Sequence, residues 1–483
     1  MIFKDLQPEL IFKYFEEILQ IPRPSKKEEK IIAYLEKFAK DNNFPYKIDG
    51  IGNVLITKPA TPGMENKKTV ILQSHMDMVP EKRTDLVHDF EKDPIKAHID
   101  GNWIKTNGTT LGADDGIGIA ASMAILTDPT IKHPAIEALF TVDEETGLTG
   151  AFGIKDGFMD GKVLINLDSE DEGELFIGSA GGIDTEAIFE YTKEPANEQD
   201  IAIEVLIDKL HGGHSGDEIH KGYGNAIQMI NRFLWNVNQE IGLRLSKFEG
   251  GKLRNAIPKD AKATFTIPSE KLNSFTELFE TFKKYFVNEY GVVEPNMQFE
   301  YKKIDKVDFT IDKTTQHGLL WSIYAAPHGE QSWDKQMEDL VETSTNLATL
   351  NYIGNNKIRV GSSQRSSVDS AKFDIATKVR TVFELAGADV NHGDGYPGWK
   401  PNPNSEILKI TEKSYEKLFG KKPIVRAIHA GLECGLFLEK YPYLDMISFG
   451  PTIKGAHTPE EKMDIKTVKM FWDLLVDVLE NSN

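Results

Sequence analysis

The chain has 483 residues, of which 40% are hydrophobic and 27% are charged, a composition typical of a globular protein. Its length exceeds what one hydrophobic core usually serves, so two domains are expected. Acidic residues outnumber basic ones by 75 to 56, and the formal charge of -19 disfavours nucleic acid and anionic membrane surfaces as partners.

The only cysteine, Cys434, permits no intrachain disulfide and no cysteine-rich zinc site, which fits a reducing compartment. Its place in GLECG, beside an apolar segment, favours a buried structural side chain. The N-terminal segment MIFKDLQPELIFKYFEEILQIPRP has helical spacing and lacks the pattern of a signal peptide. No apolar run approaches the roughly 18–20 residues that span a bilayer. We therefore expect a cytoplasmic protein.

Predicted helices and strands alternate after this first helix. Ser25 and Glu28, in PRPSKKEEKIIAYLEKFAK, have the spacing of a capping box that opens an amphipathic helix. Four short apolar segments predict buried strands: 54–57, 69–73, 136–142 and 163–167. Residues 115–128 predict a helix with small, apolar side chains on one face. This alternation predicts an α/β sheet.

The chain changes character between residues 184 and 390, where polar, alternating strands are separated by long amphipathic helices. Strands are predicted at 201–210 and 262–267, and helices at 225–241 and 274–291. Further along, Asn355 and Asn356 interrupt two strand-like runs. We interpret this part as an α+β insertion, after which residues 391–483 return to the α/β pattern.

Two polar residues, His75 and Asp77, end the strand-like run in TVILQSHMDMVPEK. They lie two positions apart at a strand end, so both side chains point to the same face. Asp77 could accept the second ring N–H of a metal-bound histidine and so fix its tautomer. The alternative for this pair alone is a hydrogen-bonded histidine near a turn.

Acidic residues follow other strands and loops of the same predicted sheet. They are Asp114 and Asp115 in LGADDGIG, Glu144 and Glu145 in TVDEETGLTGA, and Asp168 in NLDSED. Ligands of open α/β sheets gather beyond the carboxyl ends of strands, so these acids are expected to converge on one crevice. Clustered carboxylates are unfavourable there unless cations or shared protons neutralise them. A solvated loop remains the alternative for NLDSED taken alone.

The C-terminal fragment GPTIKGAHTPEEKM adds His457. The combined set suits two divalent ions that share a bridging aspartate, and the histidines favour zinc or manganese over calcium. Such a pair would activate a shared water and polarise a carbonyl. One acid must stay free as a base, and the adjacent residues Glu144 and Glu145 suit this division because they face different ways.

Five motifs, SHMDMV, LGADDGIGIA, DEETGLTGA, NLDSED and GAHTPEE, resemble in this order those of the dinuclear zinc aminoacylase/carboxypeptidase family of metallopeptidases. Within that family, the glycine after the double aspartate, the segment HGGHSGDEIH and the later HAGLECG are most similar to the cytosolic aminoacyl-histidine dipeptidases, also called Xaa-His or non-specific dipeptidases. The resemblance extends over nearly the whole chain.

The resemblance implies a role for each matched metal-binding position. His75 and Asp168 would hold one zinc ion, Glu145 and His457 would hold the other, and Asp114 would bridge both. Manganese and cobalt are the alternatives to zinc.

Three further residues receive roles in catalysis from the resemblance. Asp77 would orient His75, and Glu144 would be the general base that passes the water proton to the leaving amine. His214, in the inserted domain, would help to polarise the substrate carbonyl, in some relatives across a dimer. A separate metal site formed by the histidines of HGGHSGDEIH is disfavoured, because His214 and His220 do not have the spacing of a helical pair.

Four positions match substrate-binding positions of the family: Asn255, Arg254, Arg365 and Gly431. For the arginines, the alternative is an exposed loop side chain that is merely solvated. Two differences within the family also matter. Many relatives carry lysine where this chain has Gly116, so no role of that lysine transfers. Aspartate at position 168 is typical of dipeptidases and aminopeptidases, which favours substrates with a free amino group.

The sequence therefore predicts a dipeptidase that uses a metal-activated water to hydrolyse unblocked dipeptides, of Xaa-His type or of broad specificity. The alternatives are an aminoacylase or carboxypeptidase acting on N-blocked or longer substrates, and a non-catalytic metal-binding relative. The expected fold is an α/β catalytic metal-binding domain, with a mixed sheet flanked by helices, formed by 1–183 and 391–483. Residues 184–390 would form an inserted α+β lid, through which a homodimer is expected.

Overall fold

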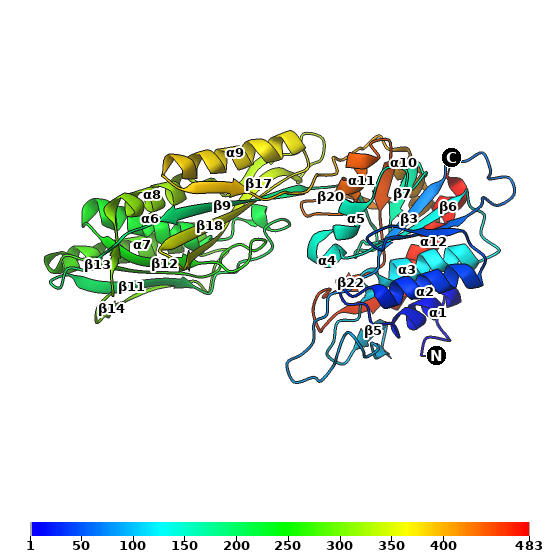
Figure 1. The fold of residues 1–483 in the computed structure, drawn as a ribbon, viewed down its shortest axis with the longest axis horizontal. Helices are drawn as coiled ribbons and strands as arrows, with labels where there is room; N and C mark the ends of the chain where they lie inside the picture. The colour runs from blue at the N-terminus through cyan, green and yellow to red at the C-terminus, as the bar shows by residue number, and fades with distance from the viewer. Residues whose placement is uncertain (1, 483) are drawn as a thin grey trace. The chain divides into compact units, whose positions relative to one another are not determined.

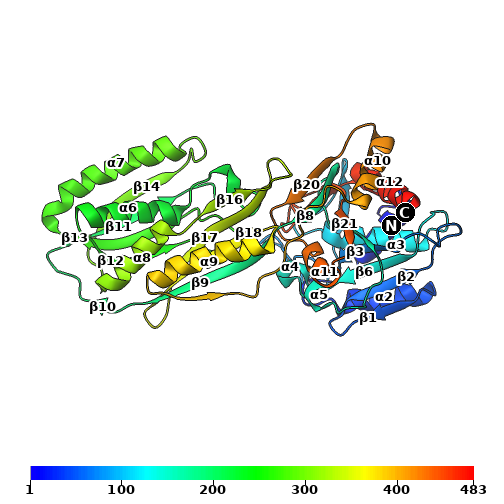
Figure 2. The ribbon, with the colours of Figure 1, turned by 90° about the horizontal axis from the view of Figure 1, so that it is seen from above.

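The chain forms two compact units in the computed structural model, which describes residues 2–482 (Figures 1 and 2). Unit 1 contains the chain up to Ser179, the segment Trp399–Ala427 and the chain from Leu432 onward. Unit 2 contains Ala180–Gly398 and the short segment Ile428–Gly431. Unit 2 is thus an insertion into unit 1. The roles predicted for the two parts, catalytic domain and lid, stay predictions.

Unit 1 is built on a mixed, eight-stranded sheet. Its strands, in spatial order, are β1 (Tyr46–Ile48), β2 (Val54–Lys58), β6 (Ile136–Thr141), β3 (Val70–His75), β7 (Val163–Asn166), β21 (Asp445–Ser448), β8 (Glu174–Ser179) and β20 (Ile424–Ile428). A smaller sheet contains β22 (Ile453–Lys454), β23 (Lys462–Asp464), β5 (Trp103–Thr106) and β4 (Ala97–Asp100). The four strands predicted for this part of the chain are all present.

The helices of unit 1 are α1 (Glu9–Ile18), α2 (Glu29–Asp41), α3 (Ala113–Thr127), α4 (Glu144–Gly147), α5 (Thr149–Gly153), α10 (Glu406–Phe419), α11 (Cys434–Lys440) and α12 (Ile465–Asn481). They lie on both sides of the central strands, and every residue of β3, β6 and β7 is buried (Figure 1). Continuous apolar runs are what strands covered on both faces require. Cys434 is fully buried, as predicted.

Unit 2 contains a nine-stranded antiparallel sheet. Its strands are β14 (Gln298–Ile304), β11 (Ile201–Asp208), β13 (Ala261–Ile267), β12 (Arg244–Gly250), β17 (Val341–Ile353), β18 (Lys357–Ser366), β9 (Gly181–Glu190) and β19 (Asp389–His392), with β16 (Gly329–Trp333) paired to β17. A two-stranded ribbon joins β10 (Lys193–Glu194) to β15 (Thr310–Ile311). Asn355 and Asn356 form the predicted turn between β17 and β18, with φ of 51° and 55°.

The α-helices of unit 2 are α6 (Ala226–Glu240), α7 (Leu272–Tyr290), α8 (Lys313–Ala325) and α9 (Asp369–Leu385), and short 3-10 turns occur at Ile219–Lys221 and Ser269–Lys271. The α-helices lie along one face of the sheet (Figure 1). Strand β11 accordingly alternates between buried and half-buried residues. The core between the two layers is aromatic: the ring of Phe233 packs edge-on against four other phenylalanine rings.

The predicted capping box at Ser25 and Glu28 is wrong. Helix α2 begins later, at Glu29, and no side chain caps it. The buried Glu28 carboxylate instead accepts the backbone N–H of Asp143, 3.0 Å away, and thereby fixes the loop after β6. A tertiary contact has replaced the local one that the sequence pattern suggested.

None of the described helices combines the length and apolar character that a membrane crossing requires.

Candidate metal centre and active site

Three parallel strands end at the same edge of the unit 1 sheet, and the predicted ligands follow these ends. Strands β3, β6 and β7 run parallel to one another. His75 is the last residue of β3, Glu145 lies in the turn of helix that follows β6, and Asp168 lies just beyond β7. Asp114 joins them from the first turn of α3, and His457 joins them from the segment after β22.

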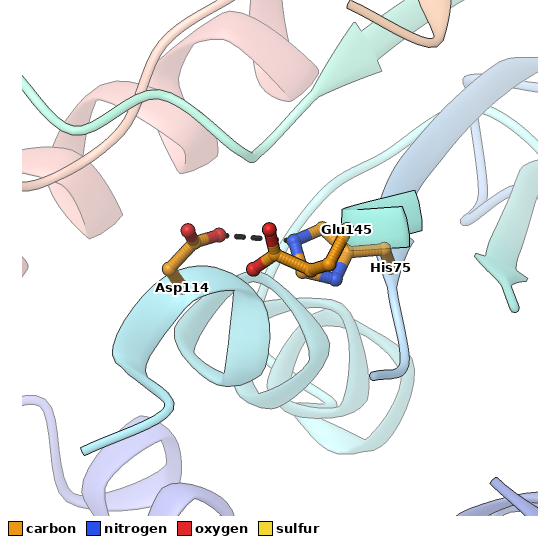
Figure 3. A group of neighbouring side chains, drawn as sticks. All are labelled: His75, Asp114 and Glu145. Atoms are coloured by element: carbon orange, nitrogen blue, oxygen red, sulfur yellow. Dashed lines mark hydrogen bonds and ion pairs between the residues drawn. The ribbon is translucent and has the colours of Figure 1, made fainter. Parts of the chain in front are cut away.

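Asp114 lies between the two histidines, and each of its carboxylate oxygens faces one of them. His75 Nε2 is 2.9 Å from Asp114 Oδ1, and His457 Nε2 is 3.1 Å from Asp114 Oδ2. The second acid beside His75 is Asp168, at 3.4 Å, and the second acid beside His457 is Glu145, at 2.9 Å. Figure 3 shows His75, Asp114 and Glu145 turned toward one another. The structure therefore brings all five predicted ligands together within unit 1.

This arrangement fits divalent ions. Ligand atoms of His75, Asp114 and Glu145 all lie within 4.8 Å of one another. Glu145 Oε1 is buried without a hydrogen-bond partner among the described residues, so one carboxylate oxygen remains available. Imidazole nitrogen and carboxylate oxygen are the donors that zinc and similar ions accept.

The pKa values reflect the density of charge at this edge of the sheet. Burial raises the pKa of the Asp168 and Glu144 carboxyls well above the usual range. Hydrogen bonds with Asp114 and Glu145 raise the pKa of His457 to about 11. Burial opposes the charged form of His75, but Asp168 and Asp114 outweigh it and raise this pKa as well. These shifts show that the acids favour positive charge at this edge of the sheet, which a bound cation would also supply.

Asp77 lies behind the proposed ligands and contacts His75 and the main chain at Glu144 and Glu145. Its Oδ1 lies 3.4 Å from His75 Nδ1, and the same oxygen accepts the backbone N–H of Glu144 over 3.0 Å. Its Oδ2 accepts the N–H of Glu145 over 3.3 Å. The fully buried Asp77 therefore lies beside one histidine and accepts hydrogen bonds from the main chain of both adjacent glutamates.

Asp77 also belongs to a second group of three buried carboxylates, with Glu28 and Asp143. These acids have other partners. Glu28 accepts the N–H of Asp143, and Asp143 in turn accepts the hydroxyls of Thr146 and Thr149. The group is explained as a set of acceptors that shapes the loop after β6.

Glu461 is a functional residue that the sequence reasoning missed. Its buried carboxylate accepts the N–H groups of Leu111 over 2.7 Å and of Ala113 over 2.8 Å, and it also faces those of Gly112 and Asp114. It thereby fixes the loop that presents Asp114. The only signal in the sequence was the second glutamate of GAHTPEE, which resembles an ordinary solvated acid.

The predicted substrate-binding residues and His214 lie in unit 2, and they differ in burial and in hydrogen-bond partners. Arg365 is only 7% exposed; its Nη1 donates to the Tyr396 hydroxyl over 3.1 Å, and its Nε has no partner among the described residues. Arg254 is exposed and forms an ion pair with Asp184 at 2.5 Å. Asn255 is exposed and accepts the N–H of Ser215 through its backbone oxygen.

His214 is a partly exposed acceptor in the loop of HGGHSGDEIH. Its Nδ1 accepts the N–H groups of Gly216 and Asp217, both at 3.3 Å, and burial lowers its pKa. A neutral ring held in this way leaves the other nitrogen as its N–H donor. Within residues 2–482, His214 does not join His211 and His220 in a ligand cluster.

Gly431 gives space to the aromatic side chain that positions Arg365. A Cβ atom at this position would lie 2.9 Å from the Tyr396 ring, and a Cβ at Gly182 would lie 2.8 Å from the same ring. Tyr396 was not identified from the sequence.

Comparison with known proteins assigns this fold to a family of peptidases. Residues 71–481 match Peptidase family M20/M25/M40, and the chain belongs to this family. It is 40% identical over 475 residues to the cytosol non-specific dipeptidase of Escherichia coli (strain K12), covering 98% of each chain. The aminoacylhistidine dipeptidase from Vibrio alginolyticus has a similar structure, with a TM-score of 0.92 and 44% identity over 99% of this chain and 98% of that one. The aminopeptidase PepT from Bacillus cereus ATCC 10987 shares the fold, with a TM-score of 0.58 and 18% identity over 98% of both chains.

Proposed function

We propose that this protein is a dipeptidase that hydrolyses unblocked dipeptides, of Xaa-His type or of broad specificity, with a pair of divalent metal ions. The observation that carries the proposal is the placement of Asp114 between His75 and His457, with one further acid beside each histidine. The names of two relatives, a non-specific dipeptidase and an aminoacylhistidine dipeptidase, support dipeptides as the substrate class.

Five side chains would hold the ions: His75 and Asp168 one of them, His457 and Glu145 the other, and Asp114 both. Zinc is the proposed metal because imidazole and carboxylate donors suit it, with manganese and cobalt as alternatives. When bound, the ions would polarise the scissile carbonyl and make a water molecule more acidic.

Glu144 is the proposed general base. Its backbone N–H donates to Asp77, and burial raises the pKa of its carboxyl, which makes the carboxylate a better proton acceptor. The carboxylate would take one proton from the attacking water as the new C–O bond forms. It would then pass this proton to the nitrogen of the leaving amine as the C–N bond breaks.

Arg365 is the proposed site for the C-terminal carboxylate of the substrate. A guanidinium that is 7% exposed and has an unpartnered Nε is costly to bury unless an anion binds to it. His214 is proposed to donate to the carbonyl oxygen as negative charge develops there, in the same chain or across a dimer. Asn255 and Gly431 would contact the substrate backbone. Arg254, the fourth residue proposed for substrate binding, forms an ion pair with Asp184 that a substrate would have to exchange.

We further propose a homodimer formed through unit 2 and a cytoplasmic location. The word cytosol in the name of the E. coli relative supports the location. Static light scattering at micromolar concentration tests the dimer, and a strict monomer would contradict it.

The decisive experiment compares turnover of Ala-His, an N-acetylated amino acid and a tripeptide by protein reconstituted with zinc, manganese or cobalt after chelation. Preferred hydrolysis of Ala-His, dependent on added metal, is expected. Preference for the acetylated substrate would point to an aminoacylase. A metal-loaded protein that cleaves no member of a broad dipeptide panel would be a non-catalytic relative.

A further inference from the structure

A buried arginine lies behind the metal centre. Arg23 follows α1 and is only 2% exposed. Its guanidinium forms hydrogen bonds to three main-chain carbonyls: Nη1 donates to Met76 O over 2.9 Å and to Asp77 O over 2.5 Å, and Nη2 donates to Gly112 O over 2.5 Å. The main chain adds a further link, because the N–H of Met78 donates to Arg23 O over 3.1 Å.

These carbonyls belong to two segments that are far apart in sequence and that both carry proposed ligands. Met76 and Asp77 directly follow His75, and Gly112 lies just before Asp114. A single planar group with several donors in fixed geometry therefore joins the end of β3 to the entry of α3. The spacing of His75 and Asp114 depends on how these two segments are held.

The glycines of LGADDGIG leave room for this group. A Cβ atom at Gly116 would lie 2.7 Å from Arg23 Nη2, and one at Gly112 would lie 2.8 Å from the same atom. Gly112 has a φ of 69°, which itself favours glycine, but Gly116 does not have a positive φ. The absence of a side chain at position 116 is thus explained by the guanidinium.

The guanidinium also places a positive charge behind the acids. Burial lowers the pKa of Arg23, but the neighbouring carboxylates of Asp77, Glu461 and Asp115 favour its charged form, and arginine remains protonated in proteins. Removal of this charge would leave those buried acids with less compensation.

We propose that Arg23 is a positioning residue of the metal centre, which fixes His75 relative to Asp114 by tying the chain after β3 to the loop before α3. The inference rests on the metal site of the proposed function. It assigns a role to a residue whose side-chain hydrogen bonds go to main-chain carbonyls.

The experiment measures zinc affinity by competition with a chelator, without any peptide present, for Arg23→Met, Arg23→Lys and Gly116→Ala. Groups that orient metal ligands typically contribute roughly 10- to 100-fold to affinity, so a loss of this size is expected for Arg23→Met. Arg23→Lys, which keeps the charge but not the fork of donors, is expected to recover part of it. Arg244→Met is the matched control, because this partly buried arginine also donates to a main-chain carbonyl, in addition to the Glu194 carboxylate, but lies in unit 2.

Gly116→Ala keeps Arg23 but intrudes on its space, so it carries the test even if Arg23→Met fails to fold. It is expected to weaken zinc binding in the wild-type background and to add little in the Arg23→Met background, because the steric conflict is then absent. Zinc affinity within twofold of wild type for Gly116→Ala and for any folded Arg23 variant would overturn the proposal.

Failure of the role proposed for Arg23 can be distinguished from failure of the proposed dipeptidase function. Wild-type protein that binds two zinc ions but cleaves no dipeptide would defeat the dipeptidase proposal, while the affinities of the variants would still decide the role of Arg23. Wild-type protein that binds no zinc would defeat both.

Discussion

Asp114 Oδ2 lies 3.1 Å from His457 Nε2, although 343 positions separate the two residues in the chain. Because His75 lies beside the other oxygen of the same carboxylate, Asp114 is the residue that the two proposed metal positions would share. Replacement of this residue should therefore affect both ions together.

Asp114→Asn is expected to remain folded and to lose metal from both positions. An amide oxygen is a weaker ligand than a carboxylate, and one bridging group would be lost from each ion. The affinity should fall by more than the roughly 10- to 100-fold that follows loss of a group that merely orients a ligand. Metal content after dialysis, measured by elemental analysis, checks this, with the exposed Asp156→Asn as control. Retention of two ions per chain would show that Asp114 does not bridge.

Glu144→Gln is expected to keep both metal ions and to lose turnover by roughly 100- to 10,000-fold, the usual contribution of a general base. Glu144 and Glu145 are adjacent, but only Glu145 lies within contact distance of His457. Metal content and kcat are measured on the same preparation, and Glu439→Gln, an exposed acid on α11, is the control. If kcat stayed within tenfold of wild type, another residue would have to be the base.

Arg365→Met should lower kcat/KM for dipeptides with a free C-terminal carboxylate by roughly 10- to 100-fold, because it removes a charge-assisted hydrogen bond. Dipeptide amides, which lack this carboxylate, should be affected far less. Tyr396→Phe removes the hydroxyl 3.1 Å from Arg365 Nη1. It should also lower kcat/KM more for dipeptides with a free carboxylate than for dipeptide amides, but by a smaller factor.

The control for these variants is Arg359→Met, which alters a half-buried arginine on the same strand that pairs with Glu186. If Arg365→Met lowered kcat/KM equally for dipeptides with a free carboxylate and for dipeptide amides, Arg365 would not be the residue that binds the carboxylate.

His429 should make the protein less stable as the pH falls. This histidine is 6% exposed, its Nε2 lies 2.7 Å from the Ser344 hydroxyl oxygen, and burial lowers its pKa to about 3. The unfolded chain, with a histidine pKa near 6.5, therefore binds more protons than the folded chain between about pH 6.5 and pH 3. The contribution of His429 to the free energy of unfolding should fall in this window by up to about 1.4 kcal/mol per pH unit.

His429→Gln should therefore show a shallower loss of stability between pH 6.5 and pH 4.5 than the wild type. The measurement is the free energy of unfolding in urea at several pH values, taken as the difference between the two proteins. A constant difference across this range would mean that the histidine titrates normally in the folded state.

Much of unit 1 was predictable because its elements carry local signals. Apolar runs gave β2, β3, β6 and β7 within a few residues, and the polar residues at their ends pointed to one edge of a sheet. The different roles expected for Glu144 and Glu145, which rest on neighbouring residues facing different ways, stay a prediction.

What could not be predicted depends on contacts between distant segments. Glu28 has the spacing of a capping residue, yet its carboxylate binds the loop at Asp143, and nothing near Glu28 in the chain indicates this. Arg23 and Glu461 have the same character: charged residues in ordinary surroundings that the fold buries against the main chain. Their partners are backbone groups, which have no signature in the sequence.

The proposed sharing of Asp114 by two ions also has a thermodynamic consequence. Two ions that share one carboxylate would bind with coupled affinities. If the first ion changes the affinity of the protein for the second by some factor, the second ion changes the affinity for the first by the same factor. A metal titration of this protein should therefore depart from the curve of two separate sites, and the departure itself would report the coupling that passes through a single side chain.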